Sequence, residues 1–347
     1  MRAAVYRGVS KLCVETVPVP EISDSEILVA VHACGICATD LKKIEQGLVP
    51  PPKIFGHEIA GTIVRAGERV AGFAVGDRVV VQHHVPCRRC FYCDKKLFSQ
   101  CELYRKTGTT AGFEPAGGGF AQYVRAMDWI VRDGTVHIPN HVSFEEASFI
   151  EPLNTCLKAL DTAGLKRGEV VAILGQGPVG LMLTQAARCE GAQVIGLDFM
   201  ESRLDVAREL GAQLALCPDG DKVVSSVATL TEGRGVDLAI VATASQRAIA
   251  DAQNLVRRGG RVLLFAQTVP GERITVDSSY ICMQEKQLIG SYSSSIELQD
   301  KAARMIFGRE VNVARLVTHR FALEQLQEGV ELASHPSVDS LKVVIQP

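Results

Sequence analysis

The residues of this chain best suited to chemistry are cysteine, histidine and glutamate side chains in two short stretches. Cys34 and Cys37 lie in CGICATD, and His57 and Glu58 lie in GHEIAGTIVRAG. A thiolate, an imidazole and a carboxylate make a three-ligand zinc set that leaves a fourth position for water or substrate. An open position distinguishes a catalytic zinc ion from a structural one. We therefore predict a catalytic zinc site that includes Cys37, His57 and Glu58.

A further acidic residue, Glu151, stands among apolar residues in FIEPLNTC. A charge in apolar surroundings is costly unless a cation or hydrogen bonds compensate it. Glu151 is therefore a second candidate carboxylate for the zinc ion, although a helix N-terminal cap or a local ion pair would also explain it. Taken alone, His57 is more often a structural residue than a ligand, and only its neighbours favour the ligand role.

Four more cysteines lie close together and form the pattern C-x2-C-x2-C-x7-C. They are Cys87, Cys90, Cys93 and Cys101. In a reducing compartment such a cluster indicates a metal site rather than disulfides, and four thiolates suit tetrahedral zinc. An iron–sulfur cluster is the main alternative, but the common ferredoxin spacings differ, and Glu102 follows where many of them have proline. Free thiols would be open to oxidation. A closed set of four cysteines predicts structural zinc.

The region from about residue 169 alternates between buried strands and helices, which predicts a βαβ unit. A strand ends near Leu174, and a helix begins at about Pro178. Between them lies a glycine-rich turn that matches G-x-G-x-x-G in its required place. Its dinucleotide-binding candidates are Gly175, Gly177, Pro178, Val179 and Gly180. The glycines allow a tight turn and a close approach of a pyrophosphate to the helix N-terminus.

Asp198 stands at the end of the second strand, about twenty residues after the glycine turn. A carboxylate at this position binds the ribose hydroxyls of adenosine and repels a 2′-phosphate, and the next residue, Phe199, supplies no cation. This pattern favours NAD over NADP. Arg203 is the residue that argues the other way, because its guanidinium could accept a phosphate; it could equally pack on adenine or face solvent.

The rest of the sequence completes a two-domain organisation. GVDLAIVATAS and GGRVLLFAQ read as further strands of a buried parallel sheet. Before about residue 150, short β-rich runs bounded by Gly, Pro and Asp indicate an irregular β barrel. We predict an α/β protein in which residues 1–150 and 288–347 form the β-rich catalytic domain and residues 151–287 form a Rossmann domain with a doubly wound parallel sheet.

Composition excludes several classes of function. The 347 residues carry a formal net charge of -2 and no long basic run, which argues against nucleic acid as a partner. No apolar stretch is long enough to span a bilayer and the start lacks a secretory pattern, so we expect a cytoplasmic protein with no membrane partner. The five cysteines outside the motifs are expected to be buried small residues. They are Cys13, Cys156, Cys189, Cys217 and Cys282.

These motifs together carry a family resemblance. CGICATD, GHEIAGTIVRAG, VGDRVV, the four-cysteine loop, GGGFAQYV, IEPL and GQGPVG occur in this order over nearly the whole chain. The sequence resembles the zinc-dependent medium-chain dehydrogenases, the zinc-containing alcohol dehydrogenase family, and is most similar to their sorbitol and polyol dehydrogenase branch. The resemblance implies a GroES-like catalytic domain beside the Rossmann domain, one catalytic and one structural zinc ion per chain, and a homodimer or homotetramer.

The resemblance also assigns roles to individual residues. Cys37, His57 and Glu58 match the catalytic zinc motif, and Glu151 matches a carboxylate that contacts the ion directly or through water. Thr39 matches the hydroxyl that receives the substrate proton. Many relatives continue this proton relay with a histidine three residues later, where this chain has Lys42. Lys42 could continue the relay if its pKa were depressed; otherwise water or the ribose would pass the proton on.

The implied activity is oxidation of a secondary alcohol, in this branch a polyol or sugar alcohol, with hydride transfer to NAD. Two related activities stay open, those of L-threonine 3-dehydrogenase and galactitol-1-phosphate dehydrogenase. Two other classes are disfavoured. A silent dinucleotide-binding regulator would have no need of the metal-binding residues, and a zinc-finger-like interaction module would explain the four-cysteine loop alone.

Overall fold

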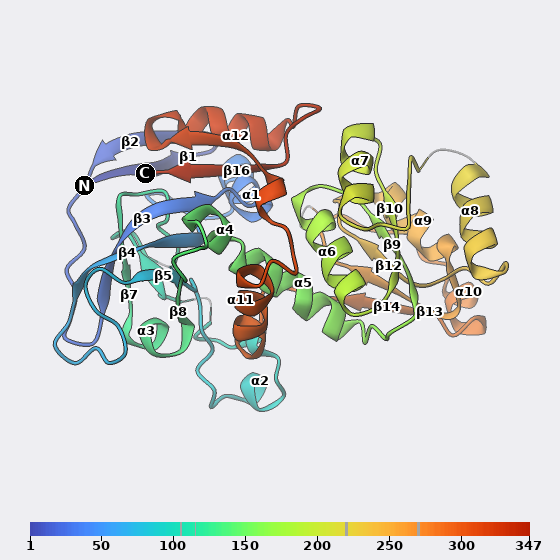
Figure 1. Ribbon diagram of the computed structural model, residues 1–347, viewed down its shortest axis with the longest axis horizontal. Helices are drawn as coiled ribbons and strands as arrows, with labels where there is room; N and C mark the ends of the chain where they lie inside the picture. The colour runs from blue at the N-terminus through green and yellow to red at the C-terminus, as the bar shows by residue number, and fades with distance from the viewer. Residues whose placement is uncertain (105, 115, 219–220, 269–270) are drawn as a thin grey trace. The chain divides into compact units, whose positions relative to one another are not determined.

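The computed structural model describes residues 1–104, 106–114, 116–218, 221–268 and 271–347 (Figure 1). The described chain forms two compact units. Unit 1 consists of Met1–Asn154, Ser294–Arg309 and Val313–Pro347, and unit 2 consists of Thr155–Ser293 and Glu310–Asn312. The chain therefore leaves unit 1 after Asn154, returns to it at Ser294 and, apart from Glu310–Asn312, remains in it to complete its sheet.

Unit 1 is built around a curled, mostly antiparallel sheet. Its strands are β3 (Ile27–Gly35), β4 (Glu58–Ala66), β5 (Arg78–Val81), β6 (Thr109–Thr110), β7 (Tyr123–Ala126), β8 (Thr135–His137), β15 (Val317–Ala322) and β16 (Lys342–Gln346). The main path runs β15-β16-β3-β4-β5-β8, and β6 and β7 continue it from β3. A separate hairpin joins β1 (Arg2–Gly8) to β2 (Lys11–Thr16).

Strand β3 determines where the first two motifs meet. It pairs with β4 in a register that places Cys34 opposite Ile59 and Gly35 opposite Glu58. On its other side, the C-terminal end of β3 pairs with β16, so that Gly35 also faces Val344 (Figure 1). CGIC, GHE and the last strand of the chain therefore converge at one end of the sheet, although nearly 290 residues separate Glu58 from Val344.

The helices of unit 1 are mostly short. They are α1 (Ala38–Gln46), α2 (Phe91–Asp94), α3 (Asp128–Gly134), α4 (Phe144–Ser148), α11 (Gln299–Phe307) and α12 (Leu326–Ser334), with 3-10 turns at Phe98–Gln100, Ile296–Leu298, Ala314–Leu316 and Leu323–Gln325. Helix α4 begins with a capping box in which Ser143 Oγ accepts from the Glu146 amide. The core is a cluster of aliphatic and aromatic side chains that includes Tyr6, Ile59 and Phe120.

Unit 2 holds a six-stranded parallel sheet in the order β11-β10-β9-β12-β13-β14. Its strands are β9 (Val170–Leu174), β10 (Gln193–Leu197), β11 (Leu214–Leu216), β12 (Val236–Val241), β13 (Val256–Leu264) and β14 (Gln287–Gly290). The strand order reverses between β9 and β12, and ligands of doubly wound sheets bind at such a point. This confirms the predicted α/β class.

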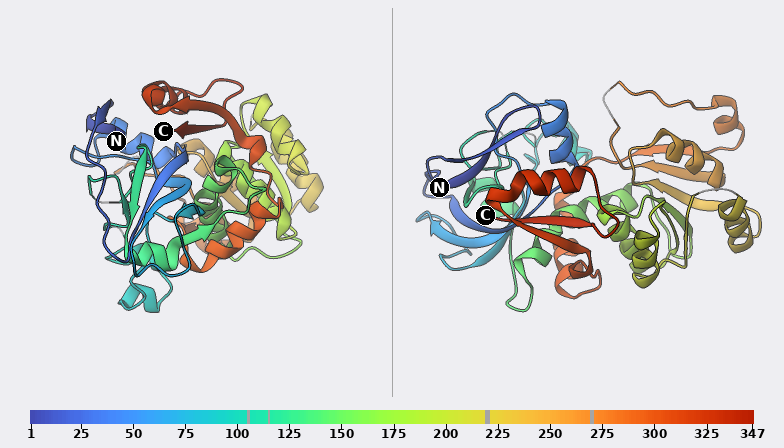
Figure 2. Two further views of the ribbon diagram at one scale, coloured as in Figure 1. Left: turned by 60° about the vertical axis from the view of Figure 1, so that its left-hand side comes forward. Right: turned by 90° about the horizontal axis from the view of Figure 1, so that it is seen from above.

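Helices cover both faces of this sheet. The helices of this part of the chain are α5 (Ile150–Thr162), whose first residues belong to unit 1, α6 (Pro178–Cys189), α7 (Glu201–Glu209), α8 (Asp221–Thr231), α9 (Gln246–Leu255) and α10 (Ser278–Met283). In the right view of Figure 2, the yellow-green helices α6 and α7 lie on one face of the sheet and α9 lies on the other. All five residues of β9 are buried, because helices shield the sheet on both sides.

The cysteines outside the motifs differ from the prediction. All eleven cysteines are free thiols, but Cys189, Cys217 and Cys282 are exposed and Cys13 is half-buried, so that only Cys156 is buried. The prediction was wrong because residue type alone does not show which face of an element a side chain occupies. In the described part of the chain, no helix combines the length and the apolar character needed to cross a membrane.

Candidate active site

Cys37, His57 and Glu58 come together in unit 1 through the pairing of β3 with β4. Cys37 is the N-cap of α1, directly after β3, and Glu58 is the first residue of β4. One potential ligand atom from each of the three side chains lies within 4.8 Å of the others. His57 and Glu58 are buried and Cys37 is half-buried. These three donors fit a zinc ion, because thiolate, imidazole and carboxylate are its usual protein ligands.

Asp40 holds the imidazole of His57 in place. It is the third residue of α1, and its Oδ1 lies 3.1 Å from His57 Nδ1 while its Oδ2 lies 3.4 Å from the Cys37 amide nitrogen. A carboxylate at Nδ1 fixes the proton there, which leaves Nε2 free as a ligand atom. The same aspartate therefore caps the helix that begins after Cys37 and selects the tautomer that a metal ion requires.

The electrostatic surroundings of His57 also suit a cation. Burial disfavours the protonated imidazole, but the negative charges of Asp40 and Cys37 outweigh it and raise the pKa of His57 well above 6.5. Without a metal ion, the ring thus takes up a proton to balance the charges around it. A site that binds a proton for this reason is also suited to a divalent cation.

Glu58 has a buried partner that the sequence analysis did not identify. Lys342 Nζ, on β16, lies 2.6 Å from Glu58 Oε1 and 2.5 Å from Oε2, and it also donates to the Ile36 carbonyl at 2.9 Å. Gly35 makes room for this pair: a Cβ added there would overlap Glu58 Oε2 and lie 2.7 Å from Lys342 Cε. The lysine compensates the charge of Glu58, one of the two carboxylates considered as zinc ligands.

Glu151, the second residue of α5, is the other carboxylate considered as a zinc ligand. It is buried, and its Oε1 lies 3.9 Å from His83 Nδ1. Burial raises the pKa of Glu151 to about 7; Glu58 and Asp40 add to the rise, and His57 and Lys342 oppose it. No lysine or arginine ion pair to Glu151 occurs among the residues the structure describes. Its charge is thus less compensated than that of Glu58, which fits a carboxylate that a metal cation would neutralise.

The four-cysteine cluster has the geometry of a metal site. One Sγ from each cysteine lies within 4.8 Å of all the others, and the Cys87 amide donates to Cys101 Sγ at 3.3 Å. The Cys93 amide lowers the pKa of Cys90 to about 7, whereas burial raises the pKa of Cys93 to about 12. The pKa values of these neighbouring thiols therefore differ. A bound cation would favour the thiolate form of all four. The four residues fit a closed tetrahedral zinc site.

The glycine-rich turn of unit 2 has the form required to hold a pyrophosphate. Gly175 follows β9 with φ +98°, which L-residues with a side chain rarely adopt. Gly177 is the N-cap of α6, and Pro178 is its first residue. A Cβ at Gly180 would overlap the carbonyl oxygen of Gly175, so the helix can lie this close to the turn only with glycine there.

Asp198 connects the second strand to this turn. Its Oδ2 accepts from the Gln176 amide at 2.7 Å, and its Oδ1 accepts from the Met200 amide at 2.9 Å. Arg203 Nη1 lies 3.7 Å from Asp198 Oδ2. The Arg203 Nε atom is buried and has no hydrogen-bond partner among the described residues. An unused donor beside a glycine-rich turn fits a nicotinamide dinucleotide, whose phosphate and ribose oxygens are acceptors.

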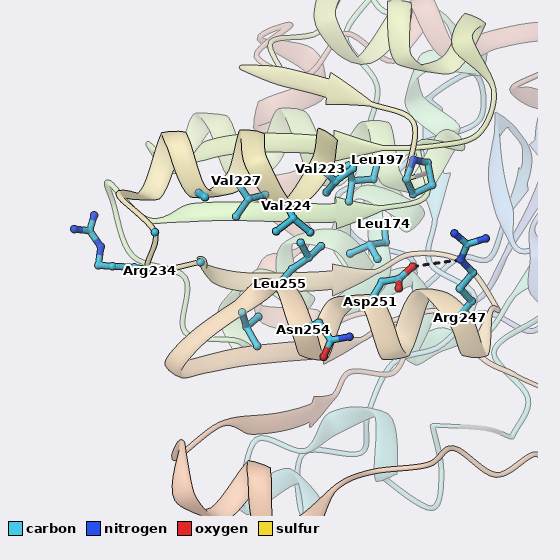
Figure 3. A pocket seen from close by; sticks show the side chains of 15 residues that line it. Leu174, Leu197, Val223, Val224, Val227, Arg234, Arg247, Asp251, Asn254 and Leu255 are labelled. Carbon is cyan, nitrogen blue, oxygen red and sulfur yellow. Dashed lines mark ion pairs between the residues drawn. The ribbon is translucent and has the colours of Figure 1, made fainter. Parts of the chain in front are cut away.

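A cavity of about 380 Å³ lies between α8 and α9 and extends from the carboxyl ends of β9 and β10 to Arg234 and Gly235, which precede β12 (Figure 3). Leu174 and Leu197, the last residues of β9 and β10, form one part of its wall, and Val223 and Val227 of α8 form another. Arg247 and Asp251 of α9 pair at its edge, with Nε to Oδ2 at 3.8 Å. An apolar cavity with a few polar groups at its edge suits a flat heterocycle such as adenine.

The structure places the other predicted residues less tightly. Thr39 lies in the first turn of α1 and is half-buried, as is Lys42 one turn later.

Three residues of the site were missed by the sequence analysis. Asp40 follows Cys37 by three positions, a capping-box spacing that could have identified it. His83 lies two residues after the end of β5, and a histidine just beyond a predicted strand could have been considered as a site residue. Lys342 gives no local signal at all.

With both sites described, comparisons with known proteins identify the family. The model of the alcohol dehydrogenase GroES-like domain matches residues 23–139, and the model of zinc-binding dehydrogenases matches residues 178–307. The chain belongs to the zinc-dependent medium-chain dehydrogenases, which are oxidoreductases that act on CH–OH groups. The family resemblance predicted from the motifs is thereby confirmed, with its GroES-like and Rossmann-like folds.

Three relatives show how far the similarity extends. Sorbitol dehydrogenase of Bacillus subtilis (strain 168) is 33% identical, and the match covers 100% of this chain and 97% of that protein. D-arabinitol dehydrogenase 1 of Uromyces fabae is 30% identical with the same coverage. A solved structure of a proposed zinc-binding dehydrogenase from Sinorhizobium meliloti 1021, bound to NADP, has a TM-score of 0.89 and 28% identity and covers 100% of this chain and 99% of its own.

Proposed function

We propose that this enzyme oxidises a secondary hydroxyl of a polyol or sugar alcohol to a ketone and transfers the hydride to NAD. The observation that carries the proposal is the convergence of Cys37, His57 and Glu58, with Asp40 fixing the free nitrogen of His57. Similarity to a sorbitol dehydrogenase and an arabinitol dehydrogenase over the full chain supports a polyol as the substrate class.

In this proposal each residue of unit 1 has a separate task. Cys37, His57 and Glu58 hold the catalytic zinc ion, and Glu151 supplies a further carboxylate as a direct ligand or through water. When bound, zinc acts as a Lewis acid that makes a nearby hydroxyl more acidic. Thr39 takes the substrate proton, because its hydroxyl follows Cys37 by two residues in the first turn of α1. Unit 2 binds the dinucleotide.

A substrate panel tests the proposed activity directly. Reduced nicotinamide is measured with sorbitol, xylitol, galactitol, L-threonine, galactitol 1-phosphate and simple secondary alcohols, with NAD and NADP in parallel. We expect turnover of free polyols with NAD. Preference for L-threonine or the sugar phosphate would replace the substrate class but keep the mechanism. Absence of turnover across the panel, with zinc and NADH both bound, would contradict the polyol proposal.

The proposed choice of NAD rests on Asp198, a carboxylate directly after β10 that would repel a 2′-phosphate of NADP. We predict that Asp198→Asn raises the ratio of kcat/KM for NADP to that for NAD by about 10- to 100-fold, since about 1.4–2.8 kcal/mol of charge repulsion is removed. The asparagine retains an acceptor for the Gln176 amide and should keep the turn folded. Steady-state kinetics with both cofactors measures the ratio.

Asp205→Asn is the matched control, because Asp205 is an exposed carboxylate on α7, the helix that follows Asp198, and pairs with Arg208 instead. In this control, the ratio of kcat/KM for NADP to that for NAD should equal that of the parent. If Asp198→Asn also leaves the ratio unchanged, Asp198 does not discriminate between the cofactors. A parent enzyme that prefers NADP, the dinucleotide bound to the Sinorhizobium meliloti protein, would contradict the NAD proposal.

We also propose that the four-cysteine cluster binds structural zinc. The apolar cluster around it contains Cys93, Phe98, Cys101 and Tyr104, too few residues to stabilise this loop by packing alone. Cys101→Ser is therefore expected to lose one zinc ion per chain and to lower the thermal unfolding midpoint, whereas the exposed Cys189→Ser should change neither. Metal analysis with differential scanning calorimetry measures both quantities, and an unchanged zinc content would contradict the proposal.

Assembly and location complete the proposal. We propose a homodimer or homotetramer, because β14 is an edge strand of its sheet and Leu288, Met283 and Tyr280 near this edge are exposed. Sedimentation velocity of the purified protein measures the assembly. Eleven free thiols suit a reducing compartment, which supports the cytoplasm as the location.

A further inference from the structure

His83 is a buried polar residue at the candidate active site that has no role in the proposed zinc binding or proton transfer. It stands directly after Gln82, which follows β5, and only 8% of its surface is exposed. Its Nδ1 atom is buried and has no hydrogen-bond partner among the described residues. Leaving such an atom unpaired is destabilising, because it has lost its hydrogen bonds to water and gained none in the protein. A buried, unpaired imidazole nitrogen beside a metal site therefore points to a ligand that would pair with it.

The position of His83 shows where this ligand lies. Its ring centroid is 4.9 Å from that of His57, and its Nδ1 atom is 3.9 Å from Glu151 Oε1. His83 thus stands between one proposed zinc ligand and the second candidate carboxylate. The distance to Glu151 exceeds that of a hydrogen bond, so Glu151 does not satisfy the nitrogen. A substrate bound at the zinc site would therefore lie close enough to His83 Nδ1 to form a hydrogen bond with it.

The ring of His83 is also held in a fixed orientation. It also packs on His84 with a centroid distance of 4.2 Å, and His84 packs on Tyr104 at 4.9 Å. The Tyr104 hydroxyl lies 3.1 Å from Ser294 Oγ, which also accepts from Gln82 Nε2 at 2.7 Å. This row of rings keeps Nδ1 directed at the site, as a residue that selects substrates requires.

We propose that His83 hydrogen-bonds the hydroxyl group next to the reacting carbon and so makes the enzyme selective for vicinal diols. The inference rests on the proposed oxidation of a secondary alcohol at the zinc site. A polyol presents a second hydroxyl one carbon away from the first, and a neutral imidazole can donate to or accept from it. A monoalcohol leaves the buried nitrogen unpaired, and sites built in this way reject substrates that lack the partner group.

A matched pair of substrates isolates this contact. 2,3-Butanediol and 2-butanol differ by one hydroxyl, the one that His83 is proposed to bind. We expect His83→Ala to lower kcat/KM for the diol by about 10- to 100-fold, the equivalent of one buried hydrogen bond, and to leave that for the monoalcohol within about twofold. His83→Asn, which places an amide near the position of Nδ1, should recover part of the loss. His335→Asn changes an exposed histidine on unit 1 and should match the parent.

Each contrary outcome has a distinct meaning. Equal losses on the diol and the monoalcohol would show that His83 positions Glu151, and no loss on either would show that it contacts no substrate; both results overturn the proposal. Calorimetric binding of the two alcohols to the NADH complex gives a readout without turnover. If the parent oxidises neither these two alcohols nor any polyol of the substrate panel, the proposed function fails. The inference is then decided by whether the diol binds more tightly than the monoalcohol and loses this advantage in His83→Ala.

Discussion

The Cys37→Ser variant is expected to lose about 1,000-fold or more in kcat, because several kcal/mol of transition-state stabilisation depend on the catalytic zinc ion. Cys37 is the only thiol in the ligand set with His57 and Glu58. Serine is a poor zinc ligand because its hydroxyl remains protonated near neutral pH. Of the three-residue set, only His57 and Glu58 then remain as ligands, and Lys342 already compensates the charge of Glu58. The zinc ion is therefore lost or displaced from its catalytic position.

NADH binding should survive in this variant. The glycine-rich turn and Asp198 belong to unit 2, whereas Cys37 belongs to unit 1, so the dissociation constant for NADH is expected to stay within about twofold. Metal analysis should find one zinc ion per chain in place of two. Cys34→Ala is the matched control, since it removes a buried thiol at the end of β3, three residues before Cys37, and should retain both ions. Near-normal turnover by Cys37→Ser would refute the proposed catalytic site.

Local patterns in the sequence were sufficient to predict much of this molecule. The turn from Leu174 to Pro178 follows from the chemistry of glycine and proline, and the structure places β9 and α6 at those positions. The spacing of the four cysteines likewise predicted a cluster that folds together. In each case the residues that form the feature are close in sequence, so the spacing itself constrains their geometry.

The parts that sequence could not predict depend on contacts between distant segments. Lys342 meets Glu58 only because β16 pairs with β3 beside Gly35, and no local spacing encodes that pairing. The role of His83 likewise depends on the fold that brings Glu151 to it. The exposed thiols, such as Cys282, were mispredicted because burial is a property of the packed unit rather than of a residue type.

Lys342→Met is expected to have the largest effect on stability. Removing the lysine leaves the carboxylate of Glu58 buried, and breaking a buried ion pair in this way costs about 3–5 kcal/mol. The double variant Glu58→Gln/Lys342→Met should recover part of the loss, because the uncompensated charge is gone. Urea unfolding of the parent and of both variants, each after removal of metal with a chelator, measures the free energies.

The same variants test whether Glu58 approaches the catalytic ion. If it does, bound zinc replaces the missing positive charge, and the penalty of Lys342→Met must be smaller in zinc-saturated than in zinc-free protein. By linkage, the Lys342→Met variant then binds zinc more tightly than the parent does. An equal penalty in both states would show that zinc does not compensate Glu58. The ligand set would then be Cys37, His57 and Glu151, with Glu58 and Lys342 as a structural pair beside it.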